Sequence, residues 1–260
     1  THRTKEAILE RLNNRVAIVT GAAQGIGAAY AKAMAAEGAS VVVADRDDGQ
    51  QVVDQIIKGG GTALNIVTDV SDETSCKAMA AQTIDAFGRI DILVNNAALF
   101  GHLDAKPFEE ISVDEWDALM AVNVRGVFVA IKSVTGQMRK QQYGKIINIA
   151  SGTLFKGTPM LLHYVTSKGA VLAMTRCISR EVGDDNICVN TLAPGLVMSE
   201  NVLARDTFSD AGVDANTETR ALKRRQMPED LTGAMIFLAS ADSDFMTGQC
   251  VVVDGGSVNN

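Results

Sequence analysis

Tyr164 and Lys168 have the residue types and the spacing of a proton-transferring pair. They lie four residues apart in a segment with helical periodicity, so one helix face would carry both side chains. A free phenol has a pKa of about 10 and is a poor base near neutral pH. A neighbouring ammonium favours the phenolate by its charge, and the pair could then exchange a proton with an alcohol. A Tyr and a Lys at this spacing are usually an exposed helix surface, so the pair needs support from other motifs.

A glycine-rich turn near the start of the chain indicates a nucleotide site. It lies between a short β-branched segment, residues 16–19, and an alanine-rich segment with helical spacing at about 26–37. Glycines let the backbone bend sharply and approach a pyrophosphate, whose charge the amides at the helix N-terminus can bind. A tight structural turn would also explain the glycines, but this position favours a dinucleotide site. The residues expected to bind the cofactor here are Gly21, Gln24, Gly25, Ile26 and Gly27.

Acidic residues end the next two apolar segments. Asp45 is placed where it can accept hydrogen bonds from both hydroxyls of the adenosine ribose, and it would repel a 2′-phosphate. This favours NAD over NADP, although the adjacent Arg46 leaves room for NADP and a solvated turn aspartate is the simpler alternative. Asp69, followed by Val70, could contact the adenine amino group. A turn aspartate ahead of a helix cap at Ser71 is nearly as good an explanation.

The elements that must position these residues alternate between strands and helices. Short apolar runs predict strands at 16–19, 40–44, 63–67, 90–95, 145–150, 187–192 and 250–253, with helical segments between them. Continuous apolar strands are typical of a parallel sheet that helices cover on both faces. The sequence therefore predicts an α/β fold: a single doubly wound Rossmann-like domain with a central, mostly seven-stranded parallel sheet.

The domain organisation is simple. Residues 1–14 are polar and are interpreted as an N-terminal arm, and residues 15–260 form the single catalytic domain. No repeat or linker divides it. The segment at about 196–227 is polar, rich in Asp and Thr and weakly periodic, and we interpret it as a mobile substrate lid.

Composition excludes several classes of protein. A net charge of -7, with no basic run, argues against a nucleic-acid partner. No apolar stretch approaches the roughly 20 residues that span a bilayer, and the start of the chain lacks a signal-peptide core, so we expect no membrane partner. The four cysteines have neither metal-ligand nor redox spacing, which favours buried reduced thiols, no metal site and a cytoplasmic protein.

Taken together, the motifs resemble the short-chain dehydrogenase/reductase family from Arg15 to Gly256. Any one of them is a weak signal, but their order and spacing are highly specific. One departs slightly from the family pattern, because Ala stands where Gly is commoner in the second motif. The motifs are Thr20 to Gly27, Asn95-Asn96-Ala97-Ala98, Asn123, Ser151, Tyr164-Val165-Thr166-Ser167-Lys168, Pro194-Gly195 and Val253-Asp254-Gly255-Gly256.

The resemblance implies a role for each residue of an NAD-dependent oxidoreductase. Ser151 would hydrogen-bond the substrate oxygen, and Asn123 would position a water that links Lys168 to solvent. Tyr164 would transfer the proton. Both Tyr164 and Lys168 would also contact the nicotinamide ribose. Further cofactor contacts are expected at Asn96, Ala97, Pro194, Gly195, Val197 and Ser199.

Three regions would form the substrate pocket, and they are largely apolar. We expect substrate contacts at Ser151, Thr153, Leu154, Tyr164 and Leu196, with Phe155, Phe100, His102 and Met198 nearby. Such a lining favours a small hydrophobic or aromatic secondary alcohol, since the hydroxyls of a polyol would lose water without replacement. His163 points away from its neighbour Tyr164 on a helix and is expected to be a packed side chain.

Two other functions stay open at this point. A 3-oxoacyl thioester reductase would share the catalytic residues and would favour NADPH, which Asp45 argues against. A nucleotide-sensing or scaffold protein would keep the fold without catalysis, and the intact set of catalytic residues argues against it. The segment 231–240 and the last strand resemble the regions through which family members pair, so we expect a homotetramer.

Overall fold

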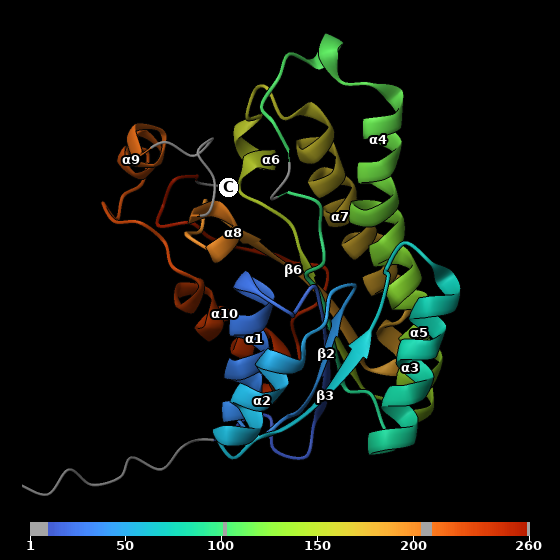
Figure 1. Cartoon of the computed structure of the whole chain (residues 1–260). Helices are drawn as coiled ribbons and strands as arrows, with labels where there is room; N and C mark the ends of the chain where they lie inside the picture. The colour runs from blue at the N-terminus through green and yellow to red at the C-terminus, as the bar shows by residue number, and fades with distance from the viewer. Residues whose placement is uncertain (1–9, 101–102, 204–209, 259–260) are drawn as a thin grey trace, which may run out of the picture.

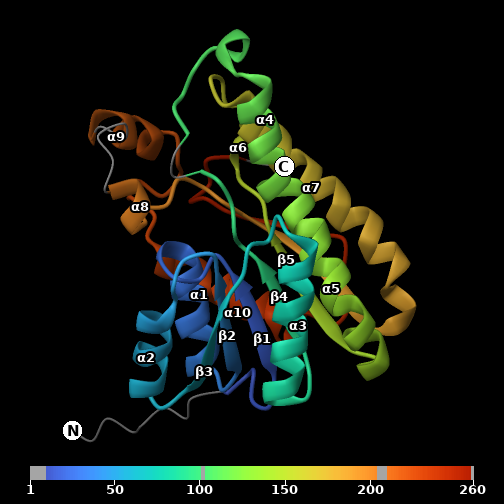
Figure 2. The same cartoon turned by 45° about the vertical axis from the view of Figure 1, so that its right-hand side comes forward.

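The protein is described by a computed structural model that covers residues 10–100, 103–203 and 210–258. A seven-stranded, all-parallel sheet runs in the order β3-β2-β1-β4-β5-β6-β7, which confirms the predicted fold class. Figure 2 shows the sheet between two helix layers. The strands are β1 Val16–Thr20, β2 Ser40–Asp45, β3 Thr62–Val67, β4 Ile92–Asn95, β5 Gly144–Ile149, β6 Ile187–Pro194 and β7 Cys250–Val253.

The helices cover both faces of the sheet and its carboxyl edge (Figure 1). One face carries α1 Gly25–Ala36, α2 Gln50–Lys58 and α10 Thr232–Ala239. The other carries α3 Glu73–Phe87, α4 Val113–Met120, α5 Gly126–Gln141 and α7 Leu162–Glu181. At the carboxyl edge lie α6 Thr153–Lys156, α8 Glu200–Leu203 and α9 Asp210–Glu218. Short 3₁₀ helices are η1 Phe108–Glu110, η3 Gly183–Asp185, η4 Pro228–Leu231 and η5 Ala241–Ser243.

Two apolar cores result from the alternation of side chains along each strand. In β1, Ala17 and Val19 pack against α1 and α10, whereas Ile18 packs against α3 and α5. Every residue of β1, β4 and β5 is buried, as expected for central strands of a covered parallel sheet. Their carboxyl ends are thereby fixed at one edge.

The described part of the predicted N-terminal arm packs on the domain. Leu12 is fully buried in the same core as α1, and its amide donates to the carbonyl of Glu37 over 2.9 Å. Arg11 forms an ion pair with Glu37 at 2.6 Å. The globular unit therefore includes residues 10–14, whereas residues 1–9 lie outside the described part of the chain.

Two local expectations were wrong. The fourth strand was predicted from residue 90, but β4 begins at Ile92. The side chain of Gln141 accepts a hydrogen bond from the amide of Ile90 and donates one to its carbonyl, so Ile90 does not pair with a neighbouring strand. All four cysteines are free, as expected, yet only Cys76 is buried, whereas Cys188 and Cys250 are half-buried and Cys177 is exposed.

The continuous helical run Val113–Gln141 is long and apolar enough to cross a membrane by length and composition. The sequence predicted no such segment. This run packs against α3, α7 and β5, and 44% of its most apolar window is buried. The core helix of a sheet protein passes the same test, so the run is weak evidence for a membrane segment.

A buried carboxylate anchors the amino end of β1. The side chain of Asp91 is fully buried and accepts from Arg15, from Arg89 and from the backbone amide of Val16. We expect Asp91→Ala to lower the free energy of unfolding by about 2 kcal/mol, because the amide of Val16 loses its acceptor and both guanidinium groups lose their counter-charge. Urea unfolding followed by circular dichroism measures the change. Asp85→Ala, at an exposed carboxylate on α3, is the matched control and should change stability by less than about 0.5 kcal/mol.

Candidate active site

A cavity of about 450 Å³ opens at the carboxyl edge of the sheet. It is bounded by the turn after β1, by the ends of the other central strands, by α7 and by the predicted lid segment. This is where ligands bind in open parallel sheets. All residues expected to bind the cofactor line it: Gly21, Gln24, Gly25, Ile26, Gly27, Asp45, Arg46, Asp69, Val70, Asn96, Ala97, Tyr164, Lys168, Pro194, Gly195, Val197 and Ser199.

The turn after β1 has the backbone of an anion-binding site. Gly21 and Gly25 adopt left-handed φ values of 64° and 59°, and a Cβ atom on Gly27 would lie 2.1 Å from the carbonyl oxygen of Gly21. Helix α1 begins at Gly25 without a side-chain cap, since Gln24 makes no capping hydrogen bond. Its first amides are therefore available to a phosphate, so the turn fits a dinucleotide pyrophosphate.

Asn96 and Thr20 brace this turn against the end of β4. The Asn96 Nδ2 donates to the carbonyls of Thr20 and Gly21 over 3.0 and 2.9 Å. In return, the Thr20 hydroxyl accepts from the amides of Asn96 and Ala97 over 3.1 Å each. The side-chain amide of Asn96 thus shapes the glycine turn.

Asp45 and Asp69 stand at the adenosine end of the cavity. One carboxylate oxygen of Asp45 accepts from the backbone amide of Ala23 over 2.9 Å, and the other accepts from the backbone amide of Asp47 over 3.1 Å. Asp69 accepts from both the amide and the hydroxyl of Ser71, and these hydrogen bonds lower the pKa of Asp69. The expected helix cap at Ser71 is wrong, because α3 begins two residues later and Asp72 caps it.

The proton-transferring pair is buried. Burial raises the pKa of Tyr164 to about 12, partly opposed by a hydrogen bond with Ser151. Burial also lowers the pKa of Lys168 to about 8. Lys168 donates to the carbonyl of Ile149 over 2.9 Å, which holds its ammonium 5.6 Å from the centre of the Tyr164 ring. A full charge at that separation stabilises a phenolate by about 3 kcal/mol for an effective dielectric constant of about 20.

Ser151 follows β5 and is oriented by the start of α6. Thr153 approaches its Oγ with both its hydroxyl and its amide, at 3.0 and 3.3 Å. Both residues line the cavity, as predicted for substrate contacts. The Ser151 hydroxyl is thereby held beside Tyr164, where it can donate to a substrate oxygen.

Asn123 is the buried residue of a π-helical turn, η2 Ala121–Arg125, between α4 and α5. Its Oδ1 accepts from the amide of Leu99 over 2.7 Å, and its Nδ2 donates to the carbonyl of Leu99 and to the hydroxyl of Ser167. Single π-turns are frequent at functional sites. Asn123 therefore ties the loop after β4 to α7, and its role in a water relay stays a prediction.

The predicted substrate residues divide into two groups. Leu196 and Phe100 line the cavity, and the Phe100 ring lies 4.8 Å from that of Tyr164. Leu154, Phe155 and Met198 do not line the cavity. Met198 instead packs with Val202 and Val213, and these three side chains form a small apolar core within the lid segment.

Two histidines were also considered. His102 lies outside the described residues. His163 is fully buried, with its Nε2 3.2 Å from Glu115, and is not part of the cavity lining. The prediction of a packed histidine is confirmed.

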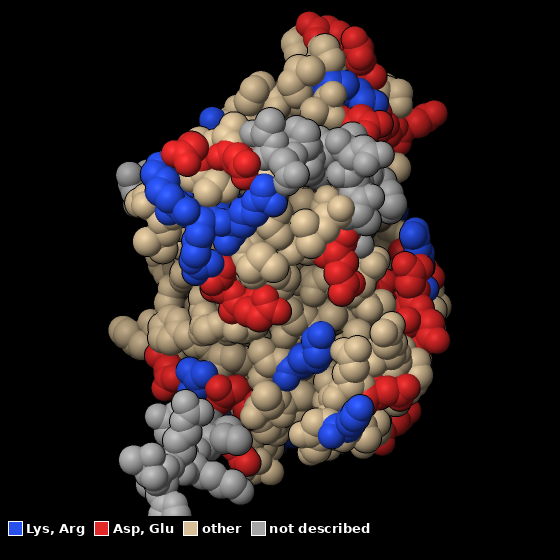
Figure 3. Space-filling model, turned by 60° about the vertical axis from the view of Figure 1, so that its left-hand side comes forward, with Lys and Arg blue, Asp and Glu red and all other residues tan. Residues whose placement is uncertain are grey.

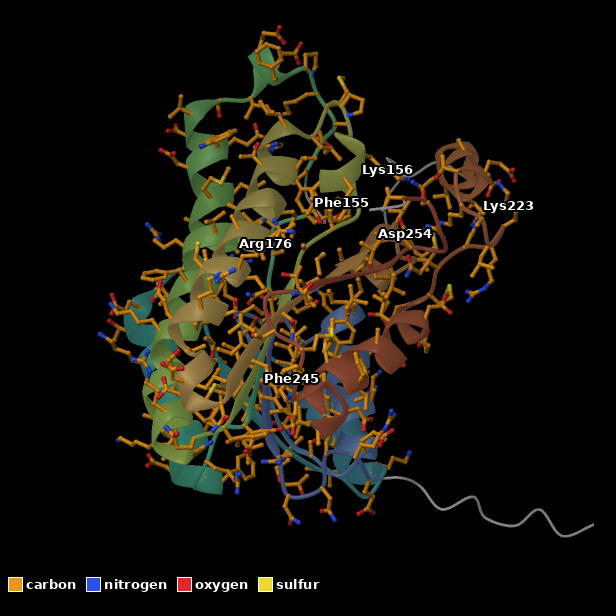
Figure 4. The ribbon with its side chains drawn as sticks, turned by 180° about the vertical axis from the view of Figure 1, so that it is seen from behind. Phe155, Lys156, Arg176, Lys223, Phe245 and Asp254 are labelled. Atoms are coloured by element: carbon orange, nitrogen blue, oxygen red, sulfur yellow. The ribbon has the colours of Figure 1, made fainter. Side chains whose placement is uncertain are left out.

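Several polar residues at the substrate end of the cavity were missed. Lys156, Asn216, Arg220, Asp254 and Ser257 all line it. Figure 4 shows Lys156 and Asp254 where α6 faces the lid segment. Lys156 lies only five residues after Ser151, which is the one sequence signal that could have found it. Nothing in the local pattern distinguishes Arg220 from the exposed cations that follow it.

The geometry supports proton exchange between Tyr164 and an alcohol. A substrate oxygen bound by Ser151 and Tyr164 would be fixed at the buried end of the cavity, with the charge of Lys168 behind the phenol. A nicotinamide bound along the cavity supplies a hydride acceptor or donor. Among the described residues, no group of three or more His, Cys, Asp or Glu side chains could hold a metal ion.

Comparisons with known proteins agree with this site. A family model described as enoyl-(acyl carrier protein) reductase matches residues 21–258. An oxidoreductase of uncharacterized activity from Mycobacterium tuberculosis is 42% identical over 249 residues, 95% of this chain and 98% of the relative. The (2S)-[(R)-hydroxy(phenyl)methyl]succinyl-CoA dehydrogenase subunit of Thauera aromatica is 36% identical over 250 residues, 94% of this chain and 97% of the relative.

A solved structure from Beutenbergia cavernae has the same fold. It carries an NAD(P)-dependent gluconate 5-dehydrogenase assignment and has NADP bound at low occupancy. Its TM-score is 0.88 at 36% sequence identity, and the match covers 96% of this chain and 98% of that chain.

Removal of the Tyr164 hydroxyl should abolish turnover and preserve cofactor binding. We expect Tyr164→Phe to lower kcat/KM for alcohol oxidation by about 1000-fold. Among the described residues that lie next to Ser151, none other than Tyr164 can take the proton. NADH binding, measured by fluorescence, should stay within about threefold of wild type. Tyr143→Phe, at a half-buried tyrosine beneath Arg15, is the control. Retained turnover in Tyr164→Phe would contradict the assignment.

The charge of Lys168 should set the pH dependence of oxidation. Oxidation needs the phenolate of Tyr164, so its rate should rise with pH, and a cation at Lys168 lowers the pKa of Tyr164. Lys168→Ala should therefore move the rising limb of the pH profile to higher pH and lower kcat/KM at pH 7 by about 100-fold. Steady-state rates from pH 6 to 10 measure this, with the exposed Lys58→Ala as control. An unmoved limb would show that Lys168 does not act on the phenol.

Proposed function

The chain belongs to the short-chain dehydrogenase/reductase family and is an oxidoreductase that acts on CH–OH groups; from this premise we propose that it is an NAD-dependent enzyme that interconverts a small hydrophobic or aromatic secondary alcohol and its ketone. The observation that carries the proposal is the joint placement of Ser151, Tyr164 and Lys168 in one cavity with the glycine turn. Ser151 binds the substrate oxygen and Tyr164 exchanges its proton.

The preference for NAD rests on the carboxylate of Asp45. It is half-buried at the end of β2, is fixed by the amide of Ala23 and lines the cavity. A carboxylate held in this way can accept from ribose hydroxyls, and it would repel a 2′-phosphate. Arg46 also lines the cavity and is the feature that favours NADP.

The apolar part of the substrate is proposed from Phe100, Leu196 and Val202, which line the cavity; the Phe100 ring lies against that of Tyr164. Aromatic and aliphatic side chains in the lining stabilise a bound apolar group. The relative from Thauera aromatica is named for a substrate that contains a hydroxy(phenyl)methyl group.

A reductase of 3-oxoacyl thioesters that uses NADPH is the second candidate. The description of the matching family model as a reductase of acyl carrier protein substrates favours it. The NADP in the Beutenbergia cavernae structure shows that this fold accepts the phosphorylated cofactor there. Asp45 is the residue that argues against this candidate.

Assembly and location are part of the proposal. We expect a cytoplasmic homotetramer with no nucleic-acid or membrane partner. The exposed ring of Phe237 lies in the segment 231–240 that is expected to pair subunits, and the exposed ring of Phe245 lies between that segment and the last strand; both favour an interface there. The four free cysteines are compatible with a reducing compartment.

The experiment that tests the proposal is NADH or NADPH formation at 340 nm with purified protein. Each cofactor is paired with aromatic, alicyclic, polyol and hydroxyacyl thioester substrates. NAD-linked oxidation of aromatic or alicyclic secondary alcohols supports the proposal. Preference for NADP and thioesters would establish the second candidate instead.

The role of Asp45 has its own test. We expect Asp45→Ser to raise the ratio of kcat/KM with NADP to that with NAD by about 100-fold, because the variant removes a repulsive charge and leaves Arg46 to bind the 2′-phosphate. Asp54→Ser, at an exposed carboxylate on α2 that does not line the cavity, is the control. An unchanged ratio would mean that Asp45 does not contact the adenosine ribose.

A further inference from the structure

Two cationic side chains lie at the substrate end of the cavity, although the sequence predicted an apolar lining there. Lys156 ends α6, five residues after Ser151, and Arg220 lies in the lid segment after α9. Both line the cavity. They come from two elements that both border the cavity, and Lys156 is exposed whereas Arg220 is buried.

The hydrogen-bond partners of both cations are neutral. Lys156 donates to the hydroxyls of Thr219 and Ser257. Arg220, only 3% exposed, donates to the carbonyls of Leu196 and Arg224 and to the side-chain oxygen of Asn216. Its Nε is buried and has no hydrogen-bond partner among the described residues. A buried guanidinium without a counter-charge is costly, and an anion in the cavity would relieve that cost.

The nearest carboxylate does not supply that counter-charge. Asp254 accepts from the amides of Gly256, Ser257 and Val258 over 3.0 Å each, and no ion pair within 4.0 Å links it to Arg220. Burial lowers the pKa of Arg220, and the more distant charge of Asp254 only partly opposes this. Asp254 is thus committed to the turn that ends the chain.

The three other cations of the lid segment between Arg220 and Met227 are arranged differently. Lys223 pairs with Glu218, Arg224 with Asp230 and Arg225 with Asp214. Figure 3 shows the corresponding surface, where basic side chains lie beside acidic ones. Each of these surface cations has an acidic partner, whereas Lys156 and Arg220 face the cavity with neutral partners. The contrast indicates that the cavity itself receives a negative group.

We propose that the substrate is a secondary alcohol that carries a carboxylate, which Lys156 and Arg220 bind while its apolar body contacts Phe100 and Leu196. This inference rests on the proposed function and names its substrate class. The Nζ of Lys156 has one donor left for a carboxylate oxygen. The nitrogens of Arg220 are bonded to protein oxygens or buried, so this residue contributes its charge rather than a hydrogen bond. The charged group and the reacting hydroxyl then fix the substrate at two points.

Equilibrium binding tests the carboxylate site without turnover. The probes are 3-phenylpropanoate, which lacks the reacting hydroxyl, and its neutral match 3-phenylpropanamide, each titrated calorimetrically into the enzyme with NAD present. Wild type should bind the acid at least about tenfold more tightly than the amide, the effect of one hydrogen bond to a charged group. Lys156→Gln should abolish this preference, and Lys156→Arg should restore most of it.

Lys223→Gln is the matched control. Lys223 lies in the same lid segment, on its outer side (Figure 4), and does not line the cavity. This variant should keep the wild-type preference for the acid. Equal binding of acid and amide by wild type, undetectable binding of the acid, or a preference that survives in Lys156→Gln would each overturn the proposal.

Turnover separates this inference from the function on which it rests. The substrates are 3-hydroxy-3-phenylpropanoate and neutral 1-phenylethanol, followed by NADH formation. A lower KM for the acid that is lost in Lys156→Gln supports the carboxylate site. Equal oxidation of both alcohols would leave the proposed function intact and overturn the carboxylate site, whereas a binding preference without oxidation of either would contradict the proposed function.

Discussion

Burial acts on Tyr164 and Lys168 in opposite directions, and the rest of the site depends on how this conflict is resolved. It raises the pKa of the phenol and lowers that of the ammonium, so it disfavours both charges needed for proton transfer. The same burial strengthens their mutual attraction once both are charged. The carbonyl of Ile149 positions the ammonium of Lys168, and the hydroxyl of Ser151 positions the phenol of Tyr164, for that interaction. Burial therefore favours proton transfer only because Tyr164 and Lys168 are held close to each other.

The parallel sheet supplies that positioning. Ile149 ends β5 and Ser151 follows two residues later, while Tyr164 and Lys168 share one face of α7, which packs on β5 and β6. Asn123 fastens α7 to the loop after β4, and Asn96 fastens the end of β4 to the glycine turn. Because the central strands end at one edge, these contacts are short and local. The cofactor turn and the proton-transferring pair are thus held by side-chain hydrogen bonds, most of which go to backbone groups.

The sequence predicted the features that follow from period and motif. Apolar runs predicted all seven strands. The glycine turn, Asp45 and Tyr164 predicted the position of the cavity, because the carboxyl ends of all strands in a parallel sheet lie at the same edge. For α6 and the lid the prediction was right only in part: Thr153, Leu196, Val197 and Ser199 line the cavity as expected, whereas Lys156 and Arg220 were missed. Thr153 and Lys156 line it and Leu154 does not, a difference set by one turn of a four-residue helix. Leu12 and Gln141 were missed because their partners are 25 or more residues away, where no local pattern reports them.

Chemistry and substrate choice occupy separate parts of the fold. The groups that bind the cofactor and move the proton belong to the sheet edge and to α7. The strands of the sheet contribute to both cores, and α7 packs in the core that holds α3 and α5. Lys156 and Arg220 belong to α6 and to the lid, and their partners are other residues of those peripheral segments and of the final turn. A substitution among them alters charge at the mouth of the cavity without moving Ser151 or Tyr164. Arg220 also joins Leu196 to Asn216, so the buried guanidinium links two parts of the lid segment at the substrate end of the cavity.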